Sequence, residues 1–179
     1  MKTIDVPVRE QVSAQTQEIF DKLNKKMGRV PNLYATIGYS DNALKGILDF
    51  EDAFSHGAFT PKEREAVNLV VSQVNNCSYC LAAHSMLAGL KGFSSEEIMQ
   101  IRKGLSVNTK LQVVLQLAKS IVENKGAVEP VLKEAFFDAG YNEAALIELI
   151  GLVTVRTFTN YVYTLTDIPV DFPAVPTLQ

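Results

Sequence analysis

The stretch that decides the fold is residues 60–84, which read TPKEREAVNLVVSQVNNCSYCLAAH. It opens with a helix start, because Thr60 offers a capping hydroxyl, a proline occupies the first turn, and Glu63 completes a capping box. This helix is expected to run to about Val74, where an asparagine pair breaks the apolar pattern. A new helix then begins at Cys77. The stretch therefore predicts two successive helices joined by a short turn.

Helix signals continue on both sides of this pair. Apolar residues recur every three or four positions, and the segments are bounded by capping residues, glycines or prolines. No alternating run flanked by turn residues indicates a sheet. The further segments expected to be helical are 11–27, a short segment at 32–39, 41–56, 94–104, 108–124, 129–140 and 142–164. The sequence predicts one all-α domain over residues 1–179, with about eight helices and an irregular, proline-containing tail at 166–179.

Composition narrows the classes of function. The 179 residues are 47% hydrophobic and 21% charged, with a formal net charge of −3, as in ordinary globular domains. No basic stripe is present, so we expect no nucleic-acid partner. The N-terminus carries no apolar signal segment, and the most apolar stretch, residues 144–155, is too short to span a membrane. We expect a soluble cytoplasmic protein with no membrane partner.

The only two cysteines, Cys77 and Cys80, stand three residues apart, and His84 follows four residues later. These spacings place the three side chains on one helix face. A thiolate is favoured at a helix N-terminus, His84 is a candidate base, and the two thiols are close enough in sequence to form a disulfide. The alternative is that both cysteines are small buried apolar residues. Three ligands fall short of the four of a structural zinc site, so we expect neither a metal nor a cofactor.

Two carboxylates stand near the start of the preceding helix. Glu63 is accounted for by the capping box, whereas Glu65 has no such role and is a candidate base. If the two helices pack antiparallel, however, the start of one lies far from the start of the next. The residues alone therefore do not bring Glu65 to the thiols.

Residues 60–84 resemble the core motif of the alkylhydroperoxidase D-like branch of the carboxymuconolactone decarboxylase superfamily. That motif is a glutamate, eleven residues, then Cys-x-x-Cys-x-x-x-His, matched by Glu65, Cys77, Cys80 and His84. The segment GLKGFSSEEI and the terminal TNYVYTLTDIPVDFP also resemble peroxidase-related members. The resemblance thus covers roughly residues 20–176, with a core redox motif at 60–92.

The resemblance implies an all-helical homo-oligomer (a dimer, trimer or hexamer) that reduces hydroperoxides with thiols. In family terms Cys80 attacks the peroxide, and Cys77 donates a proton and then resolves the sulfenic acid as a disulfide. Glu65 and His84 form the proton relay, and the reductant is a small dithiol or a lipoyl-type partner protein. The helix dipole alone would favour the first cysteine of the pair as the nucleophile.

The chain departs from the family pattern at two places. Tyr79 stands between the cysteines, where well-studied peroxidases of the family carry a histidine, and residues 160–164 lack a histidine that related chains often carry. Both losses remove proton-transfer groups, because a phenol is a poor base near neutral pH. The departures predict weaker peroxidase activity or a different substrate.

Two other functions compete with a peroxidase. One is decarboxylation of a carboxylated lactone, although the members with that activity lack the CxxC pair. The other is a non-enzymatic redox-sensing oligomer, which needs the same accessible thiols of low pKa. Arg156, within the apolar last helix, is expected to pair with Glu148 or to bind a substrate carboxylate, with pairing favoured. His56 is expected to be a polar helix end.

Overall fold

A computed structural model describes residues 3–178, and this part of the chain contains nine α-helices, two one-turn 3₁₀ helices and no strand. The all-α prediction is therefore confirmed. In chain order the elements are η1 (Arg9–Gln11), α1 (Ala14–Met27), α2 (Asn32–Ile37), α3 (Asp41–Ala53), η2 (Phe54–His56), α4 (Pro61–Val74), α5 (Ser78–Leu90), α6 (Ser95–Arg102), α7 (Thr109–Glu123), α8 (Pro130–Asp138) and α9 (Glu143–Thr166).

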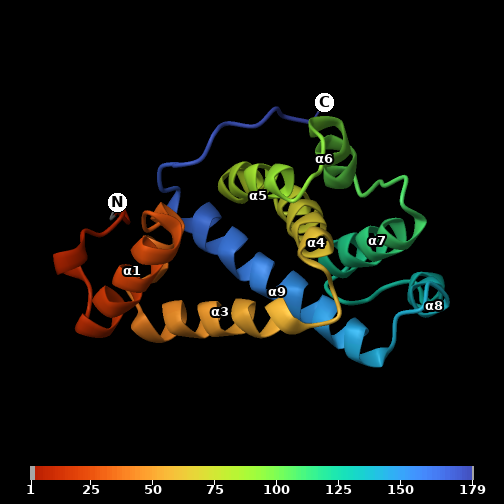
Figure 1. The fold of residues 1–179 in the computed structure, drawn as a ribbon, viewed down its shortest axis with the longest axis horizontal. Coiled ribbons are helices and arrows are strands. Elements are labelled where there is room, and N and C mark those ends of the chain that lie inside the picture. The colour runs from red at the N-terminus through yellow and green to blue at the C-terminus, as the bar shows by residue number, and fades with distance from the viewer. Residues whose placement is uncertain (1–2, 179) are drawn as a thin grey trace.

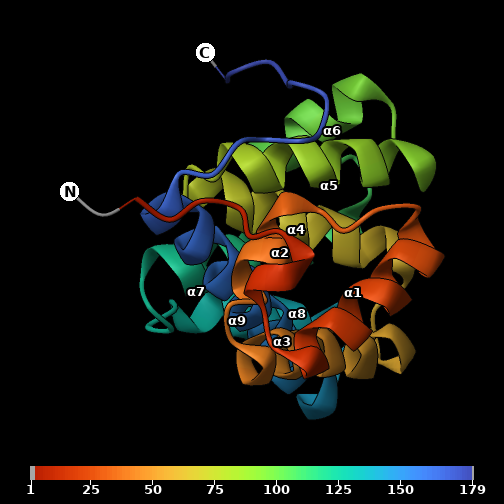
Figure 2. The same cartoon turned by 90° about the vertical axis from the view of Figure 1, so that its left-hand side faces the viewer.

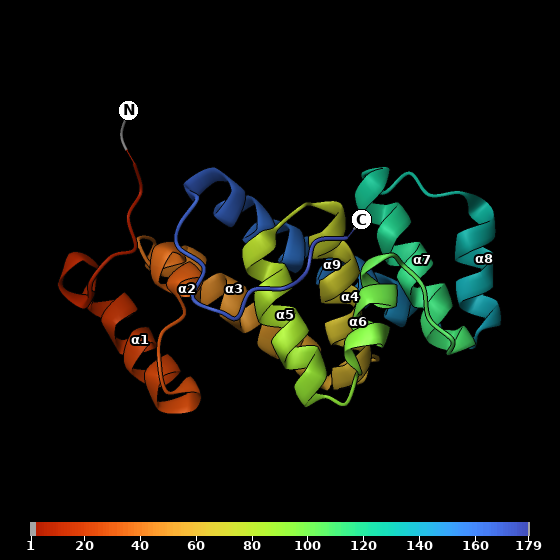
Figure 3. The same cartoon turned by 90° about the horizontal axis from the view of Figure 1, so that it is seen from above.

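Helix α4 is the centre of the fold, and α5, α6, α7 and α9 pack around it (Figure 1). Helices α1 to α3 lie at one end of the molecule and α7 and α8 at the other (Figure 3). Seven consecutive residues of α4, from Ala66 to Ser72, are buried. A helix that is buried all round reads as nearly continuous apolar sequence, and the AVNLVVS run has that character. The helix carrying Glu65 is thus the one that the other helices enclose.

Local capping interactions set the helix boundaries. At the start of α4 the Thr60 hydroxyl accepts a bond from the Glu63 N–H at 3.2 Å, and the Glu63 carboxylate accepts the Thr60 N–H at 2.8 Å. A second capping box starts α6. Helix α3 ends at Ala53, three residues earlier than expected, and continues as η2. There the Phe54 ring packs so closely on α9 that a Cβ at Gly151 would come within 2.2 Å of it.

Two apolar clusters make up the core. The larger one joins α4 to α6, α7, α8 and α9. The smaller one joins α1, α2, α3 and α9 to the start of α5, and it contains Cys77, Tyr79 and Cys80. The thiols therefore lie at the junction between the α4–α5 pair and the N-terminal helices.

The chain leaves α9 at Asp167, whose left-handed backbone (φ 49°) ends the helix. The following tail has no regular structure and runs past α5 towards α6 (Figures 2 and 3). Arg102 of α6 donates to the Pro176 carbonyl at 2.8 Å, and Asn32 donates to the Pro169 carbonyl at 3.0 Å. These bonds hold the tail against the helices that surround the cysteines.

Helix α9 has the length and composition of a membrane span, because it extends well beyond the 144–155 stretch. Half of its most apolar window is nevertheless buried inside the protein. Its inner face packs on α4 and α7, so this face serves as part of the core.

Candidate active site

The turn between α4 and α5 places both sulfurs. Asn76 adopts a left-handed backbone (φ 53°), and the Cys77 N–H then donates to the Ser72 carbonyl at 3.0 Å. Cys77 is the residue that caps α5, and its Sγ accepts the Cys80 N–H at 3.3 Å. Both cysteines are buried and free. Cys77 thus precedes the helix, and only Cys80 stands in its first turn.

The structure brings Glu65 and His84 together. Glu65 Oε2 lies 2.6 Å from His84 Nδ1, and both side chains are largely buried. Helices α4 and α5 pack against each other, and the Glu65–His84 bond joins the first turns of α4 to the middle of α5. Glu65 therefore meets α5 at His84, one turn beyond Cys80, and His84 and Cys80 line the same cavity. With Nδ1 engaged, Nε2 is the ring nitrogen left for proton exchange.

Arg156 supplies a buried cation on the α9 side of the site. Its guanidinium donates to Asn68 Oδ1, Thr159 Oγ1 and Glu51 Oε1, each at 3.1 Å. The other Glu51 oxygen accepts the Tyr34 hydroxyl at 2.7 Å. The network joins α2, α3, α4 and α9 around the cysteines.

The expected pairing of Arg156 with Glu148 is wrong. Glu148 instead accepts the backbone N–H of Ala58, at 2.5 Å. A spacing of eight residues puts two side chains on similar helix faces, but Arg156 turns inward to α3 and α4. The partner of the arginine was set by tertiary packing and not by its own helix.

Asn160 is a site residue that the sequence did not single out. It is fully buried, its Oδ1 accepts from Asn75 at 2.9 Å, and its Nδ2 donates to Ser72 Oγ at 3.3 Å. It also interacts with both thiols and favours their ionised forms. One feature of the sequence could have identified Asn160: it is an uncharged amide within an apolar helix. It also begins the 160–164 stretch, which lacks the histidine that related chains often carry.

The two thiols differ in acidity. A hydrogen bond from Cys77, together with the charges of Arg156 and His84, lowers the pKa of Cys80 to about 6, although burial acts in the opposite direction. The same hydrogen bond and burial raise the pKa of Cys77 well above its ordinary value. A thiolate at Cys80 hydrogen-bonded by a neutral Cys77 is the arrangement that this electrostatic environment favours.

The carboxylate of Glu65 is also held in its charged form. Burial alone would raise its pKa, but the charge and hydrogen bond of His84, with smaller contributions from Arg156 and Asn68, lower it overall. An ionised Glu65 orients the His84 ring through the short bond to Nδ1. The pair has the form of a carboxylate–imidazole relay.

A small cavity of about 60 Å³ lies against these groups. Its polar wall is formed by Cys80, His84 and Arg156, and most of its other lining is apolar. Met27 and Tyr34 line both this cavity and a groove of about 750 Å³ between α1 and α3. The cavity admits only a small reacting group, while the adjoining groove has room for a larger body.

Tyr79 does not join the proton-transfer groups. Its hydroxyl donates to Asp171 Oδ1 at 2.6 Å and accepts the Leu33 N–H at 3.1 Å. Asp171 also pairs with Arg29 at 2.9 Å. Burial, followed by the Asp171 bond, raises the pKa of Tyr79. Tyr79 therefore anchors the C-terminal tail.

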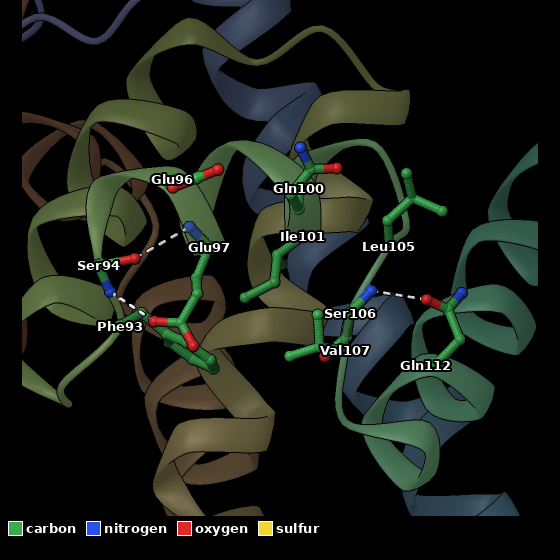
Figure 4. A pocket seen from close by; sticks show the side chains of 10 residues that line it. All are labelled: Phe93, Ser94, Glu96, Glu97, Gln100, Ile101, Leu105, Ser106, Val107 and Gln112. Atoms are coloured by element: carbon green, nitrogen blue, oxygen red, sulfur yellow. Dashed lines mark hydrogen bonds between the residues drawn. The ribbon is translucent and has the colours of Figure 1, made fainter.

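The remaining sequence candidates lie elsewhere. His56 ends η2 and is exposed. A further hollow of about 340 Å³ lies between α6 and the start of α7, and Figure 4 shows its lining, which contains no cysteine, histidine or arginine. Its Glu97 carboxylate already accepts the Ser94 N–H at 2.7 Å. Among residues 3–178 no group of three His, Cys, Asp or Glu side chains is arranged to hold a metal ion.

Residues 43–119 match the model of the Carboxymuconolactone decarboxylase family, a segment that includes the whole Glu65-to-His84 motif. The curated proteins contain no significant match to the chain. The fold is shared with several solved structures at low sequence identity, and these likenesses concern the fold alone.

Two of the similar structures are peroxidase-related proteins. One is an uncharacterized peroxidase-related protein from Silicibacter sp. TM1040 (TM-score 0.79, 21% identity), with 92% of this chain and 88% of that chain covered. Another is the alkylhydroperoxidase AhpD core protein, also an uncharacterized peroxidase-related protein, from Ralstonia eutropha JMP134 (TM-score 0.79, 18% identity), covering 89% and 87%.

A third similar structure is the debrominase Bmp8, solved as a cysteine-to-alanine variant in complex with 2,3,4-tribromopyrrole. Its TM-score is 0.77 at 19% identity, with 96% of this chain and 93% of that chain covered. The fold of this chain is thus the all-helical fold of these solved structures. The matched segment spans less than half of the chain, and it supports the resemblance to the carboxymuconolactone decarboxylase superfamily that the sequence motif suggests.

Proposed function

We propose that the protein is a thiol-dependent peroxidase that reduces hydroperoxides through Cys80 and Cys77. The observation that carries the proposal is the pairing of a buried CxxC, which favours a thiolate at Cys80, with the Glu65–His84 relay around one small cavity. Only a nucleophile whose pKa lies near or below the working pH is charged often enough to react efficiently.

In the first step, the Cys80 thiolate attacks one peroxide oxygen. The S–O bond forms as the O–O bond breaks, which leaves a sulfenic acid on Cys80 and an alkoxide. The Cys77 thiol, whose raised pKa keeps it protonated, donates its proton to the alkoxide and releases the alcohol. Arg156 lines the same cavity, so its positive charge stabilises the negative charge that develops there.

In the second step, the Cys77 thiolate attacks the Cys80 sulfur. The disulfide forms as the S–O bond breaks, and the departing hydroxide takes a proton from His84 to become water. His84 holds this proton because, with Glu65, it accepted the proton of the Cys80 thiol at the start. One hydroperoxide and two thiols thus become an alcohol, water and a disulfide.

An external dithiol then restores the pair by thiol–disulfide exchange and is itself oxidised to a disulfide. A small dithiol or a lipoyl-type group on a partner protein has the right chemistry. We further propose that the hydroperoxide places its O–O group in the 60 Å³ cavity and its larger body in the groove beyond Met27 and Tyr34. This geometry favours an organic hydroperoxide as the substrate.

The test follows hydroperoxide consumption with dihydrolipoamide as reductant. Wild type is compared with Cys80→Ser, Cys77→Ser and Glu65→Gln, and a surface variant, Val107→Ser, serves as the control for handling and folding because Val107 is 96% exposed. We expect loss of turnover in both cysteine variants and a reduced rate in Glu65→Gln. Unchanged turnover in Cys80→Ser would refute the mechanism.

Two outcomes of this test would support other functions. Reversible formation of the Cys77–Cys80 disulfide without any peroxide turnover would support a redox sensor. Conversion of a carboxymuconolactone by the Cys77→Ser/Cys80→Ser variant would support a decarboxylase.

A second candidate activity is reductive dehalogenation, which the likeness to the debrominase Bmp8 over 96% of this chain favours. The same thiol pair satisfies its stoichiometry: an aryl bromide and two thiols give the arene with hydrogen in place of bromine, a disulfide and hydrogen bromide. Bromide release from tribromopyrrole, measured with the same variants and reductant, separates this activity from hydroperoxide reduction.

A further inference from the structure

Two side chains stand between the thiol cavity and the neighbouring groove. Cys80 is 1% exposed, so a reagent has to enter the cavity of about 60 Å³ to touch its sulfur. The groove of about 750 Å³ between α1 and α3 does not touch Cys80. Met27 and Tyr34 are the two residues that line both hollows. We name these two side chains, Met27 and Tyr34, the neck.

Tyr34 forms a fixed side of the neck. Its hydroxyl donates to Glu51 Oε2 at 2.7 Å, and the other oxygen of Glu51 accepts from Arg156 at 3.1 Å. Arg156 is held in turn by Asn68 and Thr159. A hydrogen bond to a carboxylate is roughly twice as strong as one between neutral groups, so the tyrosine ring does not swing aside easily. The network that holds the cation beside the thiol thus also fixes one wall of the neck.

Met27 forms a movable side of the neck. It is the last residue of α1, and it is 45% exposed. Its backbone is fixed, because the N–H of the following Gly28 donates to the Asn24 carbonyl at 2.8 Å. Its unbranched side chain has three rotatable bonds and adapts to irregular shapes. The neck can therefore widen by rotation of one side chain, which is enough for a slender chain to pass.

The cavity behind the neck leaves little space around the reacting atoms. A cavity needs about 10–15 Å³ to hold one water-sized group, so the 60 Å³ beside Cys80 hold about four to six such groups. Leu33 and Ala83 on its lining are buried side chains of α2 and α5, and close-packed side chains resist displacement. A branch next to the reacting atoms therefore meets a wall, whereas the far end of a long ligand lies outside in the groove.

The groove beyond the neck has room for an alkyl chain. Ile19, Leu23 and Leu48 give it an apolar lining. Its charged side chains carry both signs, and two of them, Lys45 and Asp49, pair with each other. The groove as a whole therefore selects no sign of charge. An unbranched hydrocarbon chain is the body that suits both the narrow neck and this apolar lining.

We propose that Met27 and Tyr34 select ligands by shape. They admit to Cys80 a reactive group on an unbranched chain and exclude one on a branched or aryl-substituted carbon. The selection itself does not depend on the proposed chemistry. The substrate class that follows, primary alkyl hydroperoxides in preference to tertiary ones, rests on the proposed peroxidase function. One methyl group in a close-fitting apolar pocket typically changes discrimination by about 10- to 200-fold, so we expect a preference of at least about 10-fold.

The first test measures access to Cys80 without any peroxide, in the Cys77→Ser protein. The reagents are n-pentyl methanethiosulfonate and its branched isomer, 2,2-dimethylpropyl methanethiosulfonate. The thiolate attacks the sulfur that carries the alkyl group, a mixed disulfide forms, and methanesulfinate leaves. The branched carbon lies two bonds from the attacked atom, as it does in a tertiary hydroperoxide.

Each rate is divided by the rate for the same protein unfolded in urea, which cancels the intrinsic difference between the two reagents. The folded protein is expected to favour the linear isomer by about 10-fold or more. A normalised ratio near one would overturn the proposal.

Widening either side of the neck is expected to relax the selection. Met27→Ala and Tyr34→Leu should bring the ratio towards one, because they make room for the branched reagent. The ratio at a single pH does not depend on the thiolate fraction of Cys80, so a change in its pKa does not disturb the comparison. Met86→Ala and Tyr39→Leu are the matched controls, since these residues are 40% and 52% exposed and line neither hollow. An unchanged ratio in both neck variants would refute the proposal.

The C-terminal tail offers a competing route, because Phe172 also lines the cavity. Phe172→Ala is expected to relax the selection less than either Met27→Ala or Tyr34→Leu. A larger effect in Phe172→Ala than in both neck variants would place the entrance at the tail and overturn the assignment.

The second test compares kcat/KM for 1-nonyl hydroperoxide and cumene hydroperoxide, which have the same number of carbons, with dihydrolipoamide as reductant. Wild type is expected to prefer the linear substrate by about 10-fold or more, and Met27→Ala is expected to reduce this preference. Equal turnover of the two substrates, still dependent on Cys80, would refute selection at the neck and leave the peroxidase function standing. Absence of turnover with both would refute the proposed function, and the thiosulfonate ratios would then decide the role of the neck by themselves.

Discussion

Replacing Arg156 by glutamine is expected to raise the pKa of Cys80 and so slow its alkylation near neutral pH. Arg156 lines the same cavity as Cys80, and its charge is one of the interactions that lower the pKa of that thiol, after the hydrogen bond from Cys77. A nearby opposite charge typically shifts a pKa by about 1–3 units. The guanidinium is buried, so salt in the solvent screens this interaction little.

The expected magnitude follows from the pKa of Cys80, which is about 6. At that pKa, about nine-tenths of the thiol is ionised near pH 7; a rise of about one unit leaves about half, and two units leave about one-tenth. Because only the thiolate reacts, the alkylation rate near pH 7 should fall about 2-fold for a rise of one unit, about 10-fold for two and about 100-fold for three. Arg156→Gln is expected to react more slowly than wild type at every pH below both pKa values. The alkylation rates of the two proteins converge only as the pH rises above both.

The assay is the rate of alkylation by iodoacetamide as a function of pH, in a Cys77→Ser background. Serine keeps a hydroxyl that donates to Cys80, and it leaves one thiol to follow. Arg156→Lys retains the cation and should keep a near-native profile. Glu51→Gln removes the carboxylate that pairs with Arg156, so it should shift the Cys80 pKa downward, opposite to Arg156→Gln.

These opposite shifts distinguish an electrostatic role from a structural one. Damage to packing would shift the pKa of Cys80 in the same direction in Arg156→Gln and Glu51→Gln. Thermal melts of both variants would record any loss of folding. An unmoved profile in Arg156→Gln, or shifts of equal sign in Arg156→Gln and Glu51→Gln, would show that the cation does not control the thiol.

Three other changes have defined outcomes. Glu65 has a lowered pKa in the folded protein, so its contribution to stability is present above its ordinary pKa and is lost as pH falls through the folded value; Glu65→Gln should flatten the acid limb of a plot of Tm against pH, and an identical acid limb would contradict this. Cys77→Ser should trap the sulfenic acid of Cys80 after one equivalent of peroxide, detected by dimedone adduct mass; an absent adduct would argue against Cys80 as the attacking thiol. Tyr79→Phe removes the bond to Asp171 and should lower the free energy of unfolding by about 1–3 kcal/mol, measured with urea, and hasten proteolysis of the tail; an unchanged digestion rate would show that the tail is held by its other contacts.

Helix boundaries could be predicted because the signals that set them are local. The capping box of Thr60 and Glu63 lies within four residues, so the sequence identifies the start of α4. Because Glu63 fills the capping position, Glu65 could be considered for a role in the site. The register between α4 and α5 is not local. Which residue of α5 faces Glu65 depends on the asparagine turn, whose left-handed Asn76 sets how the second helix returns along the first. The contact with His84 therefore came from family resemblance and not from helix geometry.

The charged surroundings of the thiols were beyond local reasoning for the same reason. Glu51, on α3, is 105 residues from Arg156 in sequence, and no periodicity within either helix relates them. Asn160 carried a faint signal as an amide in an apolar helix, but its contact with the thiols depends on how α9 crosses the start of α5. Tyr79 was assessed only as a replacement for a histidine. Its bond to Asp171, 92 residues away, requires the path of the tail.

The asymmetry of the thiol pair resolves a conflict between two arguments made from the sequence. The helix dipole favours Cys77 as the thiolate because it comes first, whereas the family pattern favours Cys80. In the structure Cys77 is the cap itself: its sulfur accepts the Cys80 N–H and stands outside the helix. Cys80 alone stands inside the first turn, with Cys77 as hydrogen-bond donor and the charges of Arg156 and His84 near its sulfur. The helix start does favour ionisation of Cys77, whose sulfur accepts a backbone N–H, but the hydrogen bond to Cys80 and burial outweigh this effect and raise the pKa of Cys77 overall.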